Sequence, residues 1–126
     1  MKTPIQITLL FLALFFFQFA EGRAADQPQT IPTPGIITLV DLGATSCIPC
    51  KMMAPILKEL EVEYKDKAVV TFVDVWLNEA EGKRFGIRAI PTQIFFDKNG
   101  KEVLRHVGFM EKQALVDQLE RMIKEQ

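Results

Sequence analysis

Hydrophobic positions divide the chain into an apolar N-terminal run, a proline-rich stretch and a region of strand-like and helix-like segments. Residues 36–42 form a nearly continuous apolar run, which suits a strand covered on both faces, as in a parallel sheet. Residues 68–75 form a second such run. Between them, residues 51–64 carry apolar side chains at helical spacing, and Pro55 is expected to bend this helix. The pattern predicts a strand, a helix and a parallel strand joined by a right-handed crossover.

Shorter segments follow in the C-terminal half. Asn78 and Glu81 match a capping box at the start of a short helix, which Gly86 would end. Residues 92–96 and 102–107 are strand-like and are joined by a turn-type sequence, so they predict an antiparallel hairpin. A final amphipathic helix is predicted from the apolar positions Leu115, Leu119, Met122 and Ile123.

The N-terminal part has a different composition. A positively charged start is followed by an uncharged apolar run at residues 5–19 and by small residues suited to cleavage, which predicts a secretory signal over residues 1–24. This run of 15 residues falls short of the roughly 20 apolar residues that a membrane-spanning helix needs, although an uncleaved anchor is kept as the alternative. Residues 25–35 contain three prolines and predict a linker, and a single folded domain is expected over residues 36–126.

Composition limits what this domain can do. The 126 residues are 48% hydrophobic and carry a formal net charge of -1, which fits one modest core and gives no sign of nucleic-acid binding. The predicted signal would place the domain in an exported compartment, such as the periplasm, where disulfides persist. A dithiol that works as a reductant there must be recharged from an external source of electrons.

Both cysteines of the chain, Cys47 and Cys50, lie where the first predicted strand gives way to the helix. At a helix start, unpaired backbone N–H groups and the helix dipole stabilise a thiolate, so Cys47 is expected to be more acidic than a free cysteine. Cys50 would lie one turn further in, shielded from solvent and close enough to form a disulfide with Cys47. The spacing therefore favours redox chemistry.

Three other interpretations of the two cysteines are weaker. A zinc site needs about four ligands, and His106 is the only further soft ligand in the chain. Covalent haem attachment needs a histidine directly after the second cysteine, where this chain has Lys51. A purely structural disulfide stays open, although closing so short a loop stabilises a fold by only about 2 kcal/mol. We therefore expect no metal and no cofactor.

Asp41 is the one charged residue of the first apolar run. A buried carboxylate is costly unless it is paired or functional. One interpretation is a strand-end aspartate in contact with water. The other is a partly buried proton acceptor for the thiol chemistry, whose pKa is raised by loss of solvation.

Several motifs occur in the order and spacing of a known family. They are Cys-Ile-Pro-Cys-Lys at 47–51, Pro55, Phe-Gly-Ile-Arg-Ala-Ile-Pro-Thr at 85–92, Asn99-Gly100 and Val107-Gly108. On these motifs the chain resembles the thioredoxin family over roughly residues 36–125. The resemblance implies a protein-disulfide oxidoreductase with an α/β thioredoxin fold, in which helices flank a central mixed sheet.

The resemblance also implies roles for residues at the matching positions. Cys47 would be the attacking nucleophile and Cys50 the resolving thiol. Asp41 matches the family's buried aspartate, which assists proton transfer at the second cysteine. Pro91 matches the cis-proline that faces the disulfide, with an ordinary trans turn proline as the alternative. Ile90, just before it, would offer backbone hydrogen bonds to an extended substrate segment.

The chain departs from the family around this site. Gly43 and Ser46 stand where thioredoxins usually carry tryptophan, and Phe72 stands where they carry a lysine beside the buried aspartate. Trp76 is the only tryptophan of the chain. We expect it to fill the space beside Gly43 and to join the substrate-binding surface; the alternative is a tryptophan at the solvent edge that packs only on the short helix.

A further departure lies at the start of the domain. The stretch before residue 36 is too short and proline-rich for the family's first strand and helix. We therefore expect a sheet of about four strands, with the strand at residues 68–75 on or near an edge.

The function that fits these features best is an exported reductase of protein disulfides, acting as a monomer and recharged by a membrane electron carrier. The alternative is a disulfide oxidase or isomerase. Strongly oxidising relatives often place a histidine between the cysteines to stabilise the thiolate, whereas this chain has Ile48 and Pro49 there. A non-catalytic binding module is a third interpretation, and the presence of both cysteines argues against it.

Overall fold

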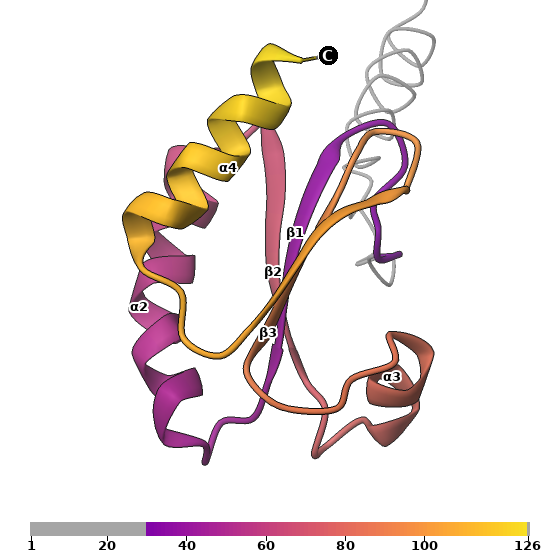
Figure 1. Cartoon of the computed structure of the whole chain (residues 1–126), viewed down its shortest axis with the longest axis vertical. Coiled ribbons are helices and arrows are strands. Elements are labelled where there is room, and N and C mark those ends of the chain that lie inside the picture. The colour runs from indigo at the N-terminus through magenta and orange to yellow at the C-terminus, as the bar shows by residue number, and fades with distance from the viewer. Residues whose placement is uncertain (1–29, 126) are drawn as a thin grey trace, which may run out of the picture.

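A computed structural model of the chain describes residues 30–125. The predicted signal and the first residues of the predicted linker lie outside this range. Along the chain the elements are β1 (Ile37–Gly43), α2 (Ile48–Glu63), β2 (Ala68–Asp74), α3 (Glu79–Arg84), β3 (Thr92–Phe96), β4 (Glu102–Val107) and α4 (Lys112–Lys124) (Figure 1). Among residues 30–125, no helix is both long and apolar enough to cross a bilayer.

The strands form one mixed sheet of four in the order β2-β1-β3-β4. β1 runs parallel to β2 and antiparallel to β3, and β3 pairs with β4 as the predicted antiparallel hairpin. β2 therefore lies at an edge of the sheet, as the sequence predicted. The α/β fold expected from the apolar pattern is confirmed.

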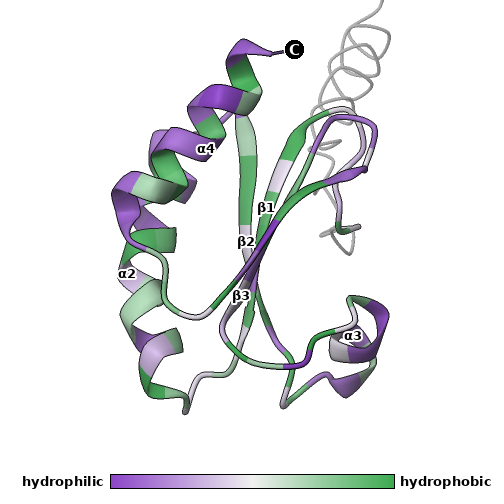
Figure 2. Cartoon of the chain, in the orientation of Figure 1, coloured by the Kyte–Doolittle hydropathy of each residue, from purple (hydrophilic) through white to green (hydrophobic). Residues whose placement is uncertain are grey.

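Side chains of β1 alternate between the two faces of the sheet and serve two separate cores. Ile37 and Leu39 belong to a cluster with residues of α2 and α4, whereas Val40 and Leu42 belong to a second cluster that includes Phe85 after α3. In Figure 1, α2 and α4 lie on one side of the sheet and α3 on the other. Figure 2 shows largely hydrophobic strands between helices that mix hydrophobic and hydrophilic residues.

Helix α2 begins earlier than its apolar periodicity predicted. Cys47 is the N-cap, and Ile48 and Pro49 belong to the first turn, where proline is tolerated because the N–H groups have no partner inside the helix. Apolar periodicity misses this turn because Ile48 is 75% exposed and does not face the core. Pro55 lies inside the helix, as expected. The two cysteines are therefore part of the start of α2.

The predicted capping box at the start of α3 does not form. Asn78 is the N-cap residue, but its side chain makes no capping hydrogen bond. The Glu81 carboxylate instead accepts hydrogen bonds from the guanidinium of Arg84, one turn along the same helix. Gly86 has φ +63°, a conformation that suits glycine just after a helix end, so the predicted C-terminal stop is confirmed.

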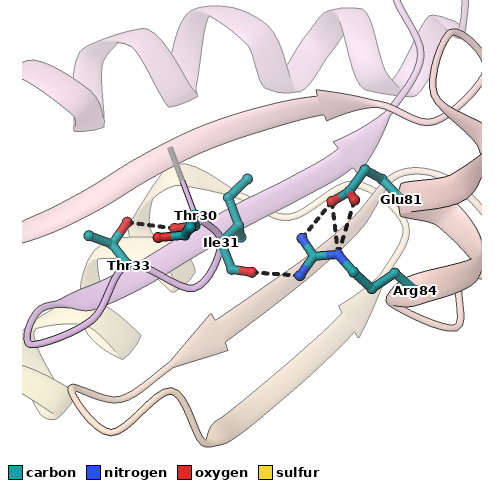
Figure 3. A network of polar contacts seen from close by, with 5 residues as sticks. All are labelled: Thr30, Ile31, Thr33, Glu81 and Arg84. Atoms are coloured by element: carbon teal, nitrogen blue, oxygen red, sulfur yellow. Dashed lines mark hydrogen bonds and ion pairs between the residues drawn. The ribbon is translucent and has the colours of Figure 1, made fainter. Parts of the chain in front are cut away.

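Residues 30–35 contain no helix or strand, as predicted for the linker, but they pack against the domain. Arg84 Nη1 donates a hydrogen bond of 2.8 Å to the backbone oxygen of Ile31, whose side chain packs against the cluster that contains Val40. Figure 3 shows this contact beside the Glu81–Arg84 ion pair. Contacts of the domain therefore begin before residue 36, because Ile31 supplies both an apolar side chain and a carbonyl that Arg84 can reach.

Candidate active site

The two cysteines lie at the N-terminus of α2 and form a disulfide with each other. Cys47 has an extended backbone, and its sulfur accepts a hydrogen bond of 3.3 Å from the backbone N–H of Cys50. Cys47 is half-buried, whereas Cys50 is only 3% exposed. A partner molecule therefore reaches the first sulfur far more easily than the second.

The helix terminus favours negative charge on Cys47. After reduction, a thiolate at the N-cap position lies beside the free N–H groups of the first turn and the positive end of the helix dipole, which lowers the pKa of the thiol. Ile48 and Pro49 add no side-chain donor. The arrangement supports nucleophilic attack by Cys47 and resolution by the shielded Cys50.

Asp41 lies in β1 and is completely buried, with an exposure of 0%. Gln93 Nε2 donates a hydrogen bond of 2.7 Å to Asp41 Oδ1, whereas Oδ2 has no hydrogen-bond partner among the described residues. Burial raises the pKa of Asp41 to about 6, and the Gln93 hydrogen bond opposes this rise by a smaller amount. The interpretation of Asp41 as a strand-end residue in water is therefore wrong, and the predicted dominance of desolvation is confirmed.

Gln93 is the residue of this site that sequence reasoning missed. It lies on β3 directly opposite Asp41 and is itself fully buried. It belongs to no motif of the cysteine chemistry, and the pattern of residues 92–96 predicts only a strand of the hairpin. The available signal was an amide side chain between the buried Thr92 and Ile94, which needs a polar partner at that depth.

The space beside Gly43 is filled by Phe72 and Cys50, which corrects the expectation for Trp76. A Cβ atom built on Gly43 lies 3.0 Å from Cys50 Sγ and 3.1 Å from Phe72 Cε2. Phe72 pairs with Asp41 in the β1–β2 register and so belongs to the row that crosses the sheet near the buried carboxylate. The residue that replaces the family's lysine thus also occupies the space that Trp76 was expected to fill.

Trp76 is held on the solvent side by the turn that follows β2. The carboxylate of Asp74 accepts hydrogen bonds from the backbone N–H groups of Trp76 and Leu77, at 3.0 and 3.1 Å, and from that of Thr45, at 2.9 Å. This turn leaves Trp76 59% exposed. The indole lines an open hollow of about 400 Å³ together with residues of α3 and with Ile90. Trp76 therefore lies at the solvent edge, as in the alternative interpretation, but it lines a hollow with Ile90 as well as with the short helix.

Strand register places the predicted site residues at one edge of the sheet. Gly43, which ends β1, pairs with Asp74 at the end of β2, and Leu42 pairs with Thr92 at the start of β3. Cys47, Trp76 and Pro91 therefore all lie in segments that leave or enter the sheet at this edge, which is the lower one in Figure 1. The peptide bond between Ile90 and Pro91 is cis. Pro91 is buried, and its carbonyl accepts a hydrogen bond of 2.8 Å from Gly108.

A second hollow lies beside Cys50. It has a volume of about 330 Å³, and its walls come from α2 and the edge strand β2, including Cys50, Leu57, Val70 and Phe72. Lys51 and Lys58 of α2 also line it. The other walls of the hollow are largely apolar.

His106, the remaining candidate metal ligand, is not part of a metal site among the described residues. Among residues 30–125, no group of three or more His, Cys, Asp or Glu side chains is arranged to hold a metal ion. The Nε2 atom of His106, the further soft ligand of the sequence, lies 3.2 Å from the backbone oxygen of Phe109. The chemistry that the described side chains support is thiol-disulfide exchange at Cys47 and Cys50.

A disulfide between two cysteines at the start of a helix, with a buried carboxylate on the strand that precedes it, is typical of a thiol-disulfide oxidoreductase. The thioredoxin family model matches residues 24–121. Thioredoxin from Bacillus subtilis is 39% identical over 93 residues, which cover 74% of this chain and 88% of that protein. Thioredoxin from Staphylococcus aureus is 41% identical over 85 residues, covering 68% and 81% of the two chains. The chain belongs to the thioredoxin family.

Solved structures agree with this assignment. The germline-specific thioredoxin Deadhead from Drosophila melanogaster superimposes with a TM-score of 0.62 at 30% identity, over 70% of this chain and 82% of that chain. A mutant thioredoxin from Halobacterium salinarum gives a TM-score of 0.63 at 32% identity, over 69% and 74%. The fold is the thioredoxin fold, and the protein is a thiol-disulfide oxidoreductase of that family.

Proposed function

We propose that this protein is an exported reductase of protein disulfides, recharged by a membrane electron carrier. The observation that carries the reductase assignment is the surroundings of Cys47, whose sulfur accepts a hydrogen bond from one backbone N–H, that of Cys50, while Ile48 and Pro49 offer no side-chain donor. Without a side-chain donor the thiolate is stabilised less than in relatives that place a histidine between the cysteines, so the reduced form is higher in free energy and the dithiol gives up its electrons more readily. The apolar run at residues 5–19 supports export.

The proposed reaction takes place in two exchanges. The Cys47 thiolate attacks one sulfur of the substrate disulfide, the other substrate sulfur leaves as a thiolate, and a mixed disulfide forms. Cys50 then gives its proton to Asp41, and its thiolate attacks the Cys47 sulfur. This step forms the Cys47–Cys50 disulfide and releases the second substrate thiolate. Two electrons have passed from the protein to the substrate.

Substrate segments would dock at the same edge of the sheet. The Ile90 backbone is proposed to hydrogen-bond an extended substrate segment that passes over Pro91. Trp76 lines the adjoining hollow with Ile90 and is 59% exposed, so its indole is available to an apolar side chain of the substrate. These contacts would position a protein disulfide against the half-buried Cys47.

The rival function is a disulfide oxidase or isomerase, and the equilibrium reduction potential of the protein separates the two. The reduction potential of thioredoxin is about -270 mV and that of the strong oxidant DsbA about -120 mV, and about 30 mV corresponds to 1.4 kcal/mol for a two-electron couple. We expect a value on the thioredoxin side, measured by equilibration with glutathione or dithiothreitol. A potential above about -150 mV on this scale would contradict the reductase assignment.

Export and recharging need a separate test. The full chain, produced in a bacterium and followed by cell fractionation, is expected in the periplasm or at the outer face of the inner membrane. A protein confined to the cytosol would contradict this part of the proposal while leaving the oxidoreductase chemistry untouched. In the correct compartment, the cysteine pair is expected to be found mainly reduced, and to become oxidised when membrane electron supply is blocked.

A further inference from the structure

Gln93 is a buried amide in which one polar atom has a hydrogen-bond partner and the other has none. Its Nε2 donates to Asp41 Oδ1 at 2.7 Å, while its Oε1 has no hydrogen-bond partner among the described residues. The side chain is completely buried, on a strand whose other four residues are Thr92, Ile94, Phe95 and Phe96. Leaving a buried carbonyl oxygen without a partner costs stability. The need for a stable core therefore does not explain why this strand carries a glutamine.

The position of Gln93 relates it to the cysteine chemistry instead. Strand register places Phe72, Asp41, Gln93 and His106 side by side across β2, β1, β3 and β4. On β1, Asp41 shares its face with Gly43, whose backbone approaches Cys50 Sγ. Helix α2, which carries Cys50, packs on this face of the sheet. Asp41 thus lies on the face of the sheet that packs against α2, next to the amide of Gln93.

We propose that Gln93 is a positioning residue for the resolving step, holding Asp41 by Oδ1 so that Oδ2 is left to accept the Cys50 proton. This inference rests on the proposed function and deepens it. In the step, the Cys50 S–H bond breaks and the proton moves to Asp41 Oδ2. The sulfur's electron pair forms the bond to Cys47, and the substrate thiolate leaves. Gln93 gains and loses no atoms, because its amide only fixes the carboxylate and stabilises its charged form.

Apart from Gln93, the neighbours of Asp41 do not stabilise its charged carboxylate. From β2 the neighbour is the apolar Phe72. Helix α2 packs on the same face and brings Cys50, which is titratable once the disulfide is reduced, close to Gly43, two residues along β1 from Asp41. His106 on β4 lies beyond Gln93 in the same row, and its Nε2 lies near the backbone oxygen of Phe109. No ion pair among the described residues involves Asp41. An ionised Asp41 therefore depends on the Gln93 donor for direct stabilisation.

The first test replaces Gln93 by methionine, which keeps the length of the side chain and removes the donor. Losing a hydrogen bond to a charged group changes an acid dissociation constant by about tenfold, so the Asp41 pKa is expected to rise by about one in Gln93→Met. Carboxyl NMR titration of the oxidised protein measures this directly, without any substrate. Gln118→Met is the matched control, because Gln118 is also buried but lies on α4. An Asp41 pKa that is the same in Gln93→Met and in the unchanged protein would overturn the proposal.

The second test asks whether Gln93 acts through Asp41. In Gln93→Met, the acid limb of the pH profile for reduction of a protein disulfide is expected to move up by about one pH unit, as the change in pKa requires. In an Asp41→Asn background the same substitution should change the rate by less than about twofold. An equal loss in both backgrounds would show that Gln93 acts on packing alone.

These outcomes are separable from failure of the proposed function. A wild-type protein that reduces no protein disulfide would refute the reductase assignment, whereas an active protein whose Asp41 pKa ignores Gln93 would refute only the role of the amide. If Gln93→Met does not fold, Gln93→Asn provides the second variant, because its amide is one methylene shorter and cannot reach Oδ1 with the same strand geometry. Its titration is expected to show the same upward movement of the Asp41 pKa.

Discussion

Gly43 and Cys50 approach each other so closely that a side chain at residue 43 would force Cys50 or Phe72 to shift. A Cβ atom at Gly43 would lie 3.0 Å from Cys50 Sγ and 3.1 Å from the Phe72 ring. We expect Gly43→Ala to lower the free energy of unfolding by about 1–3 kcal/mol, as overpacking of a core usually does. Chemical denaturation of the oxidised protein measures this change.

The neighbouring residues supply a control and a rescue for this substitution. Gly82 lies in α3, where an added Cβ would make an ordinary contact of 3.4 Å with Val75, so Gly82→Ala should be neutral or stabilise the helix by up to about 1 kcal/mol. Replacing the Phe72 ring by a smaller side chain, in Gly43→Ala/Phe72→Leu, should recover part of the lost free energy of unfolding. Equal stability of Gly43→Ala and Gly82→Ala would show that β1 and α2 separate easily.

Asp41 makes the stability of the oxidised protein depend on pH in a defined direction. Its pKa is raised from 3.8 to about 6 by burial, so the folded state holds this proton more tightly than the unfolded state does. The resulting destabilisation is absent below pH 3.8 and fully present above about pH 6, where it reaches about 3 kcal/mol. Asp41→Asn should therefore stabilise the protein at pH 8 by up to this amount and have little effect at pH 4.

Asp74 provides a comparison of opposite sign. Its pKa is lowered, first by the hydrogen bond from the Thr45 backbone and then by those from Leu77 and Trp76. These bonds stabilise the fold while Asp74 is charged, and the contribution is lost as the pH falls through the lowered pKa. Asp74→Asn should destabilise the protein at pH 8 and matter less in acid. If both variants showed the same dependence on pH, the assignment of the Asp41 penalty to its own carboxyl would be wrong.

The unequal exposure of the two cysteines predicts unequal roles. Cys50 is 3% exposed and Cys47 is half-buried at the helix terminus. Cys50→Ser should therefore accumulate stable mixed disulfides with substrates, whereas Cys47→Ser should trap few or none. Non-reducing gels of cell extracts containing each variant detect these species. In the reduced protein, Cys47 should also be alkylated faster than Cys50 at neutral pH.

Trapping is informative only if the two serine variants are equally folded. Their far-UV circular dichroism and their unfolding transitions in reductant provide this control, because the disulfide is absent from both. Equal trapping by the two variants would mean that Cys50 is also open to substrates in solution. That result would remove the asymmetry on which the resolving role of Cys50 depends.

Much of the fold could be predicted because its signals are local. The apolar runs of β1 and β2 and the turn between β3 and β4 mark these elements in the sequence, and each strand lies within about one residue of its predicted range. The start of α2 was predicted too late because Ile48 faces solvent and interrupts the periodicity. The capping box at Asn78 failed because Arg84 binds the glutamate that the box requires.

The site was predictable only where chemistry fixes the spacing. Cys47, Cys50 and Pro91 lie in motifs, so the order of residues along the chain is enough to identify them. Gln93 belongs to no such motif, because its relation to Asp41 is created by pairing between strands 52 residues apart. The predicted place of Trp76 was wrong for a similar reason, since the Asp74 turn decides the course of the chain after β2. The secretory signal stays a prediction.

Trp76 is therefore expected to contribute to substrate binding rather than to packing of the core. Because its side chain is 59% exposed, Trp76→Ala should change the unfolding midpoint little, yet it removes an aromatic surface from the hollow shared with Ile90. We expect KM for a protein disulfide to rise about threefold to tenfold, which corresponds to about 0.7–1.4 kcal/mol of lost binding, while kcat changes little.

A small disulfide distinguishes docking from chemistry at the cysteines. Hydroxyethyl disulfide carries no protein segment that could dock in the hollow, so Trp76→Ala should reduce it at the wild-type rate. Leu77→Ala is the matched control, because Leu77 is 85% exposed on the same turn but does not line the hollow. It should leave both substrates unaffected. Equal losses for the protein and the small disulfide in Trp76→Ala would show that the indole acts on the cysteine pair itself, because the small substrate has no segment to dock.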